Sequence, residues 1–291
     1  MRPVFTWNLG KRVLELGKRT LVMGIVNVTP DSFSDGGQHF LTETAISHAL
    51  KLTSEGADIL DIGGESTRPG AKVGLKDSAV SVEDELQRVL PVIAAVKQAK
   101  PEAIVSIDTY KARVARAAVE SGAEIVNDVS GLQWDPEMTS TLAKLNCGLV
   151  LMHARGRPDE WASLPTVPDL VTVVKRELRE RVDKGIAAGI KRNRVALDPG
   201  FGFGKRNEEN YPLLRRFHEF HELRFPLVVG VSRKSFVGHA LMRNGQRLET
   251  ADRLYGTLGA EVAAALKGAH LIRTHDVKAC VEAMRLADIA G

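Results

Sequence analysis

The sequence contains very little cysteine. Only Cys147 and Cys280 occur among its 291 residues, far apart and outside any Cys-x-x-Cys spacing. Two such cysteines form no disulfide framework, and their spacing fits neither a zinc site nor a redox pair. We therefore expect both side chains to be reduced and buried for packing, as in a cytosolic protein.

Long apolar segments and clusters of one charge are also missing. The N-terminal residues MRPVFTWNLGKR lack the apolar stretch of a signal peptide, and no run approaches the ~18 apolar residues of a membrane span. The formal charge of +4 is small, and no Lys/Arg-rich run indicates nucleic-acid binding. These absences predict a cytoplasmic protein with neither a membrane nor a nucleic acid as its partner.

Short apolar segments alternate with longer segments of helical spacing along the chain. The apolar segments are mostly continuous, which is typical of strands buried on both faces of a parallel sheet. They cover Leu21–Val28, Asp58–Gly63, Ala103–Asp108, Glu124–Val129, Gly148–His153, Val195–Asp198, Leu227–Val231 and His270–His275. The helical segments are Thr44–Ser54, Val82–Lys97, Tyr110–Ser121, Pro136–Leu145, Leu170–Ala188, Asn207–Glu222, Ala251–Leu266 and Val277–Ile289.

This repetition predicts an α/β protein, a single (β/α)8 TIM barrel. An open doubly wound sheet is the alternative. No linker or shift in composition divides the chain, so we expect one barrel domain over residues 20–291. In residues 1–19, Val4–Trp7 and Arg12–Leu16 flank a turn at Asn8–Gly10, which predicts a hairpin extension that closes the bottom of the barrel.

Every predicted strand ends in polar side chains. In such a barrel the active site lies at the C-terminal ends of the strands. The polar strand ends are Asn27, Glu65–Arg68, Asp108, Asn127–Asp128, His153, Asp198, Ser232–Lys234 and Arg273–His275. One such residue is as easily a helix cap as a ligand contact, but the same feature on every strand predicts a site at this rim.

The rim residues combine two chemistries. Hydrogen-bonding groups for the N–H edge of a flat heterocycle come from Asp108, Asn127 and Asp198. Positive charge suited to a phosphate or diphosphate comes from Arg68, Arg233, Lys234, Arg273 and His275.

Some of these positions have a simpler explanation. For Asp128 and Asp276 we favour helix capping, and Asp61 is equally well explained as an internal hydrogen-bonded carboxylate. The Gly-rich segment Pro199–Lys205 lacks the spacing of a phosphate-binding loop, and we expect it to expose Phe203 over the site.

The strand-end motifs resemble those of the dihydropteroate synthase family. GIVNVTPDSFSDGG at 24–37 is similar to the family's first signature and GESTRPG at 64–70 to its second. Further matches are SIDT at 106–109, NDVSG at 127–131, MH at 152–153, LDPGFGFGK at 197–205, SRKS at 232–235 and RTHDV at 273–277. The resemblance extends from the N-terminal hairpin to the last helix.

The resemblance implies a transferase of folate biosynthesis. Its reaction joins 6-hydroxymethyl-7,8-dihydropterin diphosphate to 4-aminobenzoate and yields 7,8-dihydropteroate and pyrophosphate. The expected chemistry is a dissociative substitution at the pterin methylene, which needs electrostatic stabilisation of the leaving group rather than a protein nucleophile. The resemblance also implies a homodimer and makes sulfonamides candidate inhibitors.

Residue roles follow from the same resemblance. The implied pterin-binding residues are Asp108, Asn127, Asp198 and Lys234. Mg²⁺ is the implied cofactor with Asn27 as its ligand, and the implied diphosphate-binding residues are Asn27, Arg68, Arg273 and His275. The implied aminobenzoate pocket consists of Thr67, Arg68, Pro69, Phe203, Lys234 and Ser235. The implied catalytic residues are Arg273, His275, Lys234 and Asp108, and Phe33 and Asp35 lie on a loop that we expect to close over the site.

One segment departs from the family pattern, and two other functions stay open. The connection Ala71–Ala79 is about six residues longer than usual, which loops tolerate but which leaves the aminobenzoate pocket and its tolerance of sulfonamides open. The alternatives are a catalytically silent pterin-binding paralogue and a pterin-dependent methyltransferase. The complete motifs after the first, second and eighth strands argue against both.

Overall fold

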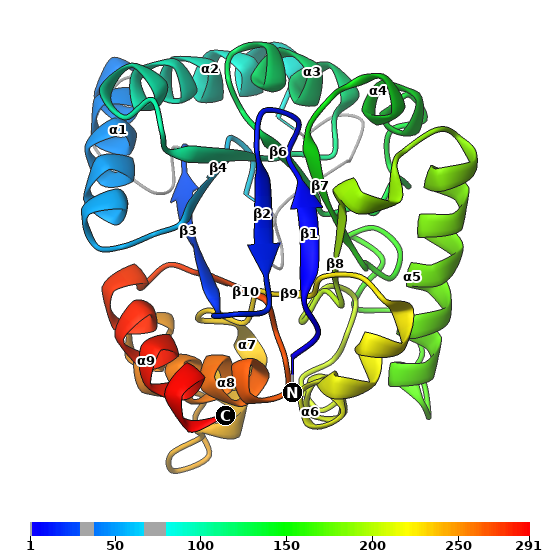
Figure 1. The fold of residues 1–291 in the computed structure, drawn as a ribbon. Helices are drawn as coiled ribbons and strands as arrows, with labels where there is room; N and C mark the ends of the chain where they lie inside the picture. The colour runs from blue at the N-terminus through cyan, green and yellow to red at the C-terminus, as the bar shows by residue number, and fades with distance from the viewer. Residues whose placement is uncertain (1, 30–37, 67–79) are drawn as a thin grey trace.

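The computed structural model describes residues 2–29, 38–66 and 80–291. Its barrel strands are β3 (Leu21–Asn27), β4 (Ile59–Gly63), β5 (Ile104–Asp108), β6 (Ile125–Asp128), β7 (Gly148–Met152), β8 (Val195–Asp198), β9 (Val228–Val229) and β10 (Leu271–Thr274). The α-helices are α1 (Gln38–Ser54), α2 (Val82–Ala99), α3 (Ala112–Glu120), α4 (Met138–Lys144), α5 (Leu170–Ala187), α6 (Asn210–Arg215), α7 (Ser235–Ala240), α8 (Leu254–Leu266) and α9 (Val277–Ala290). Figure 1 shows the helices as a ring around the strands.

The barrel strands form one closed parallel sheet. They neighbour one another in the order β8-β7-β6-β5-β4-β3-β10-β9. The two ends of this order also meet, because Leu197 of β8 pairs in parallel with Leu227 and donates its N–H to the Pro226 carbonyl at 2.8 Å. This closure confirms the predicted TIM barrel and excludes the open sheet.

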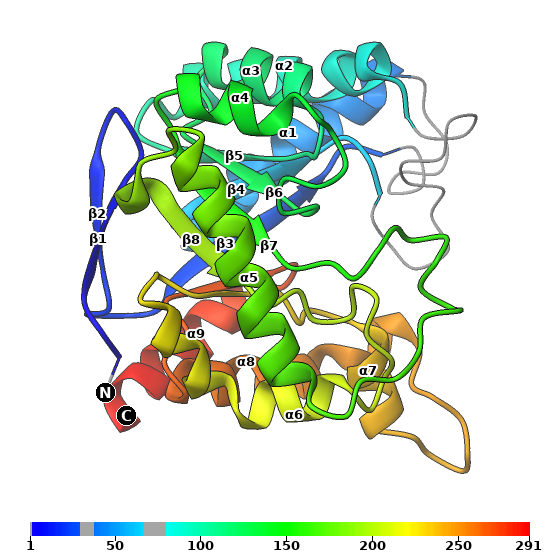
Figure 2. The ribbon, with the colours of Figure 1, turned by 90° about the vertical axis from the view of Figure 1, so that its right-hand side faces the viewer.

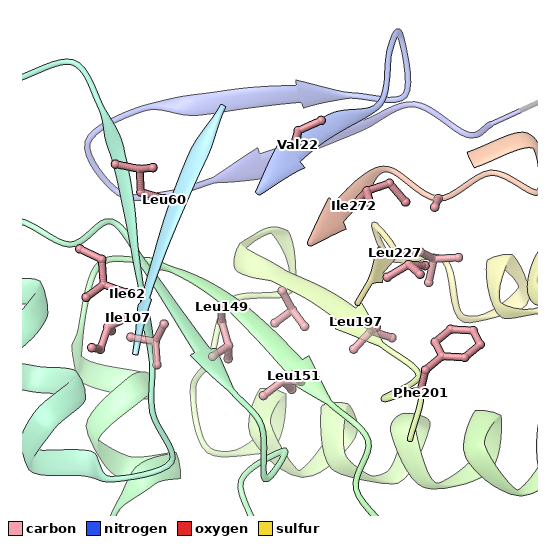
Figure 3. Close-up of a cluster of buried hydrophobic side chains, with 14 of the residues drawn as sticks. Val22, Leu60, Ile62, Ile107, Leu149, Leu151, Leu197, Phe201, Leu227 and Ile272 are labelled. Carbon is pink, nitrogen blue, oxygen red and sulfur yellow. The ribbon is translucent and has the colours of Figure 1, made fainter. Parts of the chain in front are cut away.

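The side chains that point outward from the strands pack against the helices in one large buried cluster (Figure 3). From successive strands they include Val22, Leu60, Ile107, Val126, Leu149, Leu197, Val229 and Ile272. Because neighbouring residues of a strand point to opposite faces, the residues on either side of each of these point into the barrel. This alternation decides which strand-end side chains can face the site.

The N-terminal hairpin seals one end of the barrel, as predicted. Strands β1 (Phe5–Asn8) and β2 (Val13–Leu16) pair antiparallel and lie across that end (Figures 1 and 2). Trp7, Leu9 and Leu16 are buried against an inward apolar layer made of Met23, Ile59, Ile125, Val150, Ala196, Val228 and Leu271. A Cβ on Gly148 would lie 2.3 Å from Cδ2 of Leu9, so any side chain there would displace the buried Leu9.

Several helical segments differ from the prediction, and the first is α1, which begins at Gln38 rather than at Thr44. The segment predicted at 207–222 is α6 followed by a 3₁₀ helix (Phe217–Leu223), whose buried Phe217, Phe220 and Leu223 repeat every three residues as a 3₁₀ helix requires. Thr250–Arg253 is likewise a 3₁₀ turn before α8. Helix α7 was not predicted, because its short sequence holds too few apolar residues to show a helical period.

Two further findings concern the features that the sequence lacks. Cys147 and Cys280 are free and buried, in agreement with the prediction. None of the helices in the described stretches is at once long enough and apolar enough to cross a bilayer.

His270, directly before β10, is a fully buried histidine that contacts the N-terminal segment. Its Nδ1 accepts a hydrogen bond from the Leu227 N–H at 3.0 Å, so Nε2 carries the proton and donates to the Pro3 carbonyl at 2.9 Å. Burial lowers the pKa of His270 to about 4. Protonation of Nδ1 would place an N–H group against the Leu227 N–H.

We expect His270 to make the protein less stable as the pH falls from 7 to 5. An unfolded histidine has a pKa near 6.5, so in this window the unfolded chain binds the proton more readily, and roughly 2 kcal/mol of stability is lost. Urea unfolding at both pH values should show a smaller pH dependence in His270→Asn than in the wild type. The exposed His218→Asn is the control, and an unchanged pH dependence in His270→Asn would contradict this account.

Candidate active site

A second inward-facing layer lies above the apolar layer. Each strand contributes to it the residue two positions beyond its apolar inward side chain. These residues are Ile25, Asp61, Ser106, Asn127, Met152, Asp198, Gly230 and Arg273. Five of these eight residues are polar, so the barrel interior becomes mainly polar at the end opposite to the hairpin.

Arg273 lies at the centre of this layer. Its Nε–H donates to Oδ2 of Asp61 at 2.6 Å, and an Nη2–H donates to Oδ2 of Asp108 at 2.5 Å. Nδ2 of Asn127 donates to the same Asp61 oxygen at 3.1 Å. Burial alone would lower the pKa of Arg273, but Asp61 and Asp108 raise it above its ordinary value, so the cation is permanent.

Asp108 lies at the top of β5, beside Arg273. Burial raises the pKa of its carboxyl to about 7; Arg273 opposes this rise and Asp61 adds to it. Oδ1 of Asp108 and Oδ1 of Asp61 are buried and have no hydrogen-bond partner among the described residues. Both oxygens can accept N–H groups from a ligand in this layer.

Asp198, the last residue of β8, is the member of this layer that β8 contributes. Its Oδ1 accepts a hydrogen bond from the Gly200 N–H at 2.7 Å. Burial raises the pKa of Asp198, and Lys234 and Arg273 act in the opposite direction. A Cβ on Gly230 would lie 3.8 Å from Cβ of Arg273 and 3.9 Å from Oδ2 of Asp198, which places this glycine beside both side chains.

The loop after β8 is held in place by Lys205. Its buried Nζ donates to the carbonyl oxygens of His153 at 3.1 Å, Gly200 at 2.7 Å and Phe203 at 3.1 Å. Gly200 has φ +67°, and a Cβ there would lie 1.9 Å from the His153 oxygen, so only glycine fits. The position of Phe203 is therefore set by the loop's own contacts.

Phe203 and Lys234 come together from neighbouring loops. Nζ of Lys234 lies 4.5 Å from the centre of the Phe203 ring and donates to the Phe201 carbonyl. Burial lowers the pKa of Lys234 to about 8, although Asp198 raises it. Ser235, the next residue, begins α7.

His275 and Asn27 complete the described part of the rim. Nδ1 of His275 lies 2.9 Å from Oγ of Ser232, at the ends of neighbouring strands. Asn27 is half-buried at the end of β3 and lies two positions beyond Ile25, so its side chain points inward.

Not every polar strand end faces the mouth of the barrel. His153 is fully buried on the helix side, with its Nε2 2.9 Å from Oε2 of Glu177 in α5. Asp128 also points away from the barrel interior; it does not cap a helix but accepts from the N–H groups of Ser130 and Leu132 in the turn after β6. The prediction that every strand contributes a polar side chain to the rim was therefore wrong for His153, because it assumed no side-chain direction.

Arg233 and Asp276 are paired with each other. Asp276 occupies the N-cap position of α9, but its side chain makes no cap hydrogen bond there. Instead it accepts from Nε and Nη2 of Arg233 at 2.9 and 2.5 Å. Capping by Asp276 was thus wrongly predicted, and the Arg233 charge is neutralised by a carboxylate rather than offered to a ligand.

Several predicted site residues lie outside the described residues. They are Phe33 and Asp35 on the first loop, and Thr67, Arg68 and Pro69 on the second, together with the long connection Ala71–Ala79. Their roles stay predictions from the resemblance.

Two important residues were absent from the predicted site. Asp61 binds Arg273 and Asn127, and its signal was a lone carboxylate at an inward position within an apolar strand. Lys111 is buried and joins Glu65, Glu85 and the Val80 carbonyl at 2.7, 2.5 and 2.7 Å. Nothing in the sequence around Lys111 indicated that this lysine is buried or that it pairs with two glutamates.

Comparison with known proteins agrees with this geometry. The family model for pterin binding enzymes matches residues 23–275. The dihydropteroate synthase of Escherichia coli (strain K12) is 45% identical over 267 residues, which cover 92% of this chain and 90% of the relative. The structure of Yersinia pestis dihydropteroate synthase with a sulfonamide drug complex has a TM-score of 0.88 at 42% identity, with 98% of both chains covered.

Two structures of Xanthomonas albilineans dihydropteroate synthase are also similar. The structure with 4-aminobenzoic acid has a TM-score of 0.88 at 43% identity and covers 99% of this chain and 98% of its own. The structure in complex with 7,8-dihydropteroate has a TM-score of 0.82 at 38% identity, with 98% of both chains covered. The chain belongs to the dihydropteroate synthase family of pterin-binding enzymes.

Proposed function

We propose that the chain joins 6-hydroxymethyl-7,8-dihydropterin diphosphate to 4-aminobenzoate, with release of pyrophosphate, as a step of folate biosynthesis. The observation that carries this proposal is the Asp61–Arg273–Asp108 cluster, anchored on the fully buried Asp61 and lying beside Asp198. It puts acceptors for a heterocycle next to a permanent cation for an anionic leaving group. Relatives bound to 4-aminobenzoic acid and to 7,8-dihydropteroate support it, since these are the second substrate and the product.

In this proposal the pterin ring lies in the polar inward layer. Asp198 accepts N–H groups from the amino-pyrimidine edge, while Asp108 and Asn127 bind the rest of the ring. Lys234 donates to the ring from the β9 side. The pKa of about 7 at Asp108 suits a carboxyl that bonds a neutral heterocycle next to other carboxylates.

The diphosphate lies at Arg273 and His275. In the described part of the chain, two of the five N–H donors of the Arg273 guanidinium bind Asp61 and Asp108, and these bonds orient the group. We propose that the other donors bind the diphosphate. Arg68, outside the described residues, is a further candidate from the resemblance.

Mg²⁺ is the cofactor that we propose. The described residues contain no group of three or more His, Cys, Asp or Glu side chains that could hold a metal alone, and Asn27 supplies one amide oxygen. This sparse donor set fits Mg²⁺, which keeps several waters and binds largely through substrate phosphates. When bound, it neutralises part of the diphosphate charge.

The chemistry is a substitution at the pterin methylene carbon. The bond from this carbon to the diphosphate oxygen breaks, the leaving group keeps the electron pair, and the pterin ring nitrogens share the remaining positive charge. The neutral amine of 4-aminobenzoate attacks the carbon and then loses a proton to solvent. Arg273 and His275 stabilise the leaving group, so electrostatics and positioning supply the rate enhancement.

The aminobenzoate pocket is proposed at the outer loops. Phe203, Lys234 and Ser235 line its described side, and Thr67 and Pro69 belong to it by resemblance. The Yersinia pestis relative bound to a sulfonamide drug supports competition by sulfonamides in this pocket.

We also propose a cytoplasmic homodimer. The free, buried cysteines support the location. The exposed apolar side chains Tyr255 and Leu266 on α8 and Leu286 and Ile289 on α9 support an interface there. Sedimentation of the purified protein measures the oligomeric state directly.

The decisive experiment is a pyrophosphate-release assay on purified protein. Release should require both the pterin diphosphate and 4-aminobenzoate, and omission of either should abolish it. Protein that binds pterin but releases no pyrophosphate would be a silent paralogue, and methyl transfer without pyrophosphate release would identify the methyltransferase alternative.

Asp198→Asn should weaken pterin binding by roughly 10- to 100-fold. The substitution removes a charged acceptor, and a hydrogen bond to a charged group contributes about 1.5–3 kcal/mol. The amide oxygen can still accept from Gly200, so the loop keeps its contact. Calorimetric titration with a pterin that lacks diphosphate measures the effect. The exposed Asp252→Asn is the control, and unchanged affinity in Asp198→Asn would remove this residue from the pterin site.

A further inference from the structure

Ser232 is a nearly buried side chain between the ends of β9 and β10 that the proposed chemistry does not use. Its Oγ meets three polar groups of β10 and the following residue. Nδ1 of His275 lies 2.9 Å away, the His275 backbone N–H donates to Oγ at 3.2 Å, and Thr274 Oγ1 lies at 3.4 Å. One hydroxyl therefore contacts both the backbone and the ring of His275.

The hydrogen positions follow from counting donors and acceptors. A serine hydroxyl has one proton to donate and two lone pairs. The His275 backbone N–H can only donate, so it occupies one lone pair. Thr274 Oγ1 donates to the other lone pair at 3.4 Å, so the serine proton is left for Nδ1 at 2.9 Å.

The surroundings of Thr274 agree with this direction. Thr274 is fully buried, and its Oγ1 already accepts from the Asp276 N–H at 3.3 Å. Its own proton is donated to the second lone pair of Ser232 at 3.4 Å. The Ser232 proton is therefore left for the His275 ring.

We propose that Ser232 is a positioning residue that holds neutral His275 with its proton on Nε2. Nδ1 is then the acceptor toward Ser232, and Nε2 presents an N–H. This inference rests on the proposed function in one respect: the Nε2–H is the form that can donate to a diphosphate oxygen, whereas a bare Nε2 would present a lone pair to an anion.

The position of Ser232 also fixes the plane of the ring. The backbone and the ring of His275 bind the same oxygen, so the ring cannot turn about its bonds without breaking the Nδ1 contact. Removal of the partner that orients a metal-ligating histidine typically costs about 10- to 100-fold in activity, and we expect a loss near the lower end for His275.

The direct test is the ¹⁵N spectrum of histidine-labelled, substrate-free protein at about pH 8, where an ordinary histidine is neutral. His275→Gln identifies the His275 signals. We expect Nε2 to carry the proton and Nδ1 to be unprotonated and hydrogen-bonded. A proton on Nδ1 would overturn the proposal whether or not the protein is active.

Kinetics provide the second test. Ser232→Ala should lower kcat for pyrophosphate release by roughly tenfold with little change in KM for 4-aminobenzoate, and Ser232→Thr, which keeps the hydroxyl, should restore most of it. Inorganic pyrophosphate should also bind Ser232→Ala more weakly. The exposed Ser140→Ala is the matched control.

The outcomes separate the two proposals. If the wild type releases no pyrophosphate, the proposed function fails, while the spectrum still reports the ring proton. If the wild type is active but Ser232→Ala keeps the wild-type kcat, or Ser232→Thr is as impaired as Ser232→Ala, the positioning role is wrong.

Discussion

Arg273→Ala should lower kcat for pyrophosphate release by about 10³-fold, because it removes a fixed cation from the developing charge of the leaving diphosphate. Binding of a pterin without diphosphate should weaken by less than about tenfold, because Asp198 and Asn127 still bind the ring. The large effect requires a guanidinium that is already oriented in the free enzyme. Its bonds to Asp61 and Asp108 provide that orientation.

The measurement pairs steady-state kinetics with calorimetric pterin titration. Arg273→Ala also leaves the Asp61 and Asp108 carboxylates without their cation, so Arg273→Lys is the second variant. Lysine keeps the charge but cannot bind both carboxylates in the guanidinium geometry, and the kcat of Arg273→Lys should lie between those of the wild type and Arg273→Ala. Arg113→Ala, an exposed residue of α3, is the control. Equal losses of turnover and pterin affinity would count against a role at the leaving group.

Lys111→Met should destabilise the folded protein by roughly 3–5 kcal/mol, the usual cost of removing one partner from a buried ion pair. The Lys111 ammonium binds Glu65 at 2.7 Å and Glu85 at 2.5 Å, and both carboxylates are almost inaccessible to solvent. Without the lysine the two acids face each other in a buried space. Guanidinium unfolding of the wild type and the variant measures the difference.

The pH dependence of this loss makes the test sharper. Burial raises the pKa of Glu85, and Lys111 now limits that rise. In the variant the folded pKa should rise further above the unfolded value, so stability is lost as the pH increases through that window and the deficit is larger at pH 8 than at pH 5. The exposed Lys144→Met should show neither effect. A deficit below about 1 kcal/mol at pH 8 would mean that the buried pairs contribute little.

The barrel could be predicted because its strands are continuous apolar runs. Val195–Asp198 was predicted with both its ends, and Gly148–His153 extends only one residue beyond β7. The hairpin was predicted from its turn. The 3₁₀ helix at Phe217–Leu223 was not, since a repeat of three residues is easily taken for the helical repeat over so short a segment.

The site could be predicted only in part, since strand-end position does not give side-chain direction. Asn127 and Asp128 are neighbours, yet one binds Asp61 inside the barrel and the other a turn outside it. Counting alternate residues from the apolar layer would have distinguished them and would have included Asp61. Contact between Arg273 and Asp61, 212 residues apart, has no local signature.

The hairpin also limits how ligands can enter and leave the barrel. Trp7, Leu9 and Leu16 close one end of the barrel against its packed apolar layer, so a ligand cannot reach the polar layer from that end. Phe203 and Ser235 belong to loops at the opposite end, where we expect a ligand of Asp198 and Arg273 to enter. The proposed 4-aminobenzoate site then lies on the entry path of the pterin substrate. A molecule bound in this outer pocket would keep the pterin from leaving. On this proposal the pterin binds before 4-aminobenzoate, because the hairpin closes the other end of the barrel.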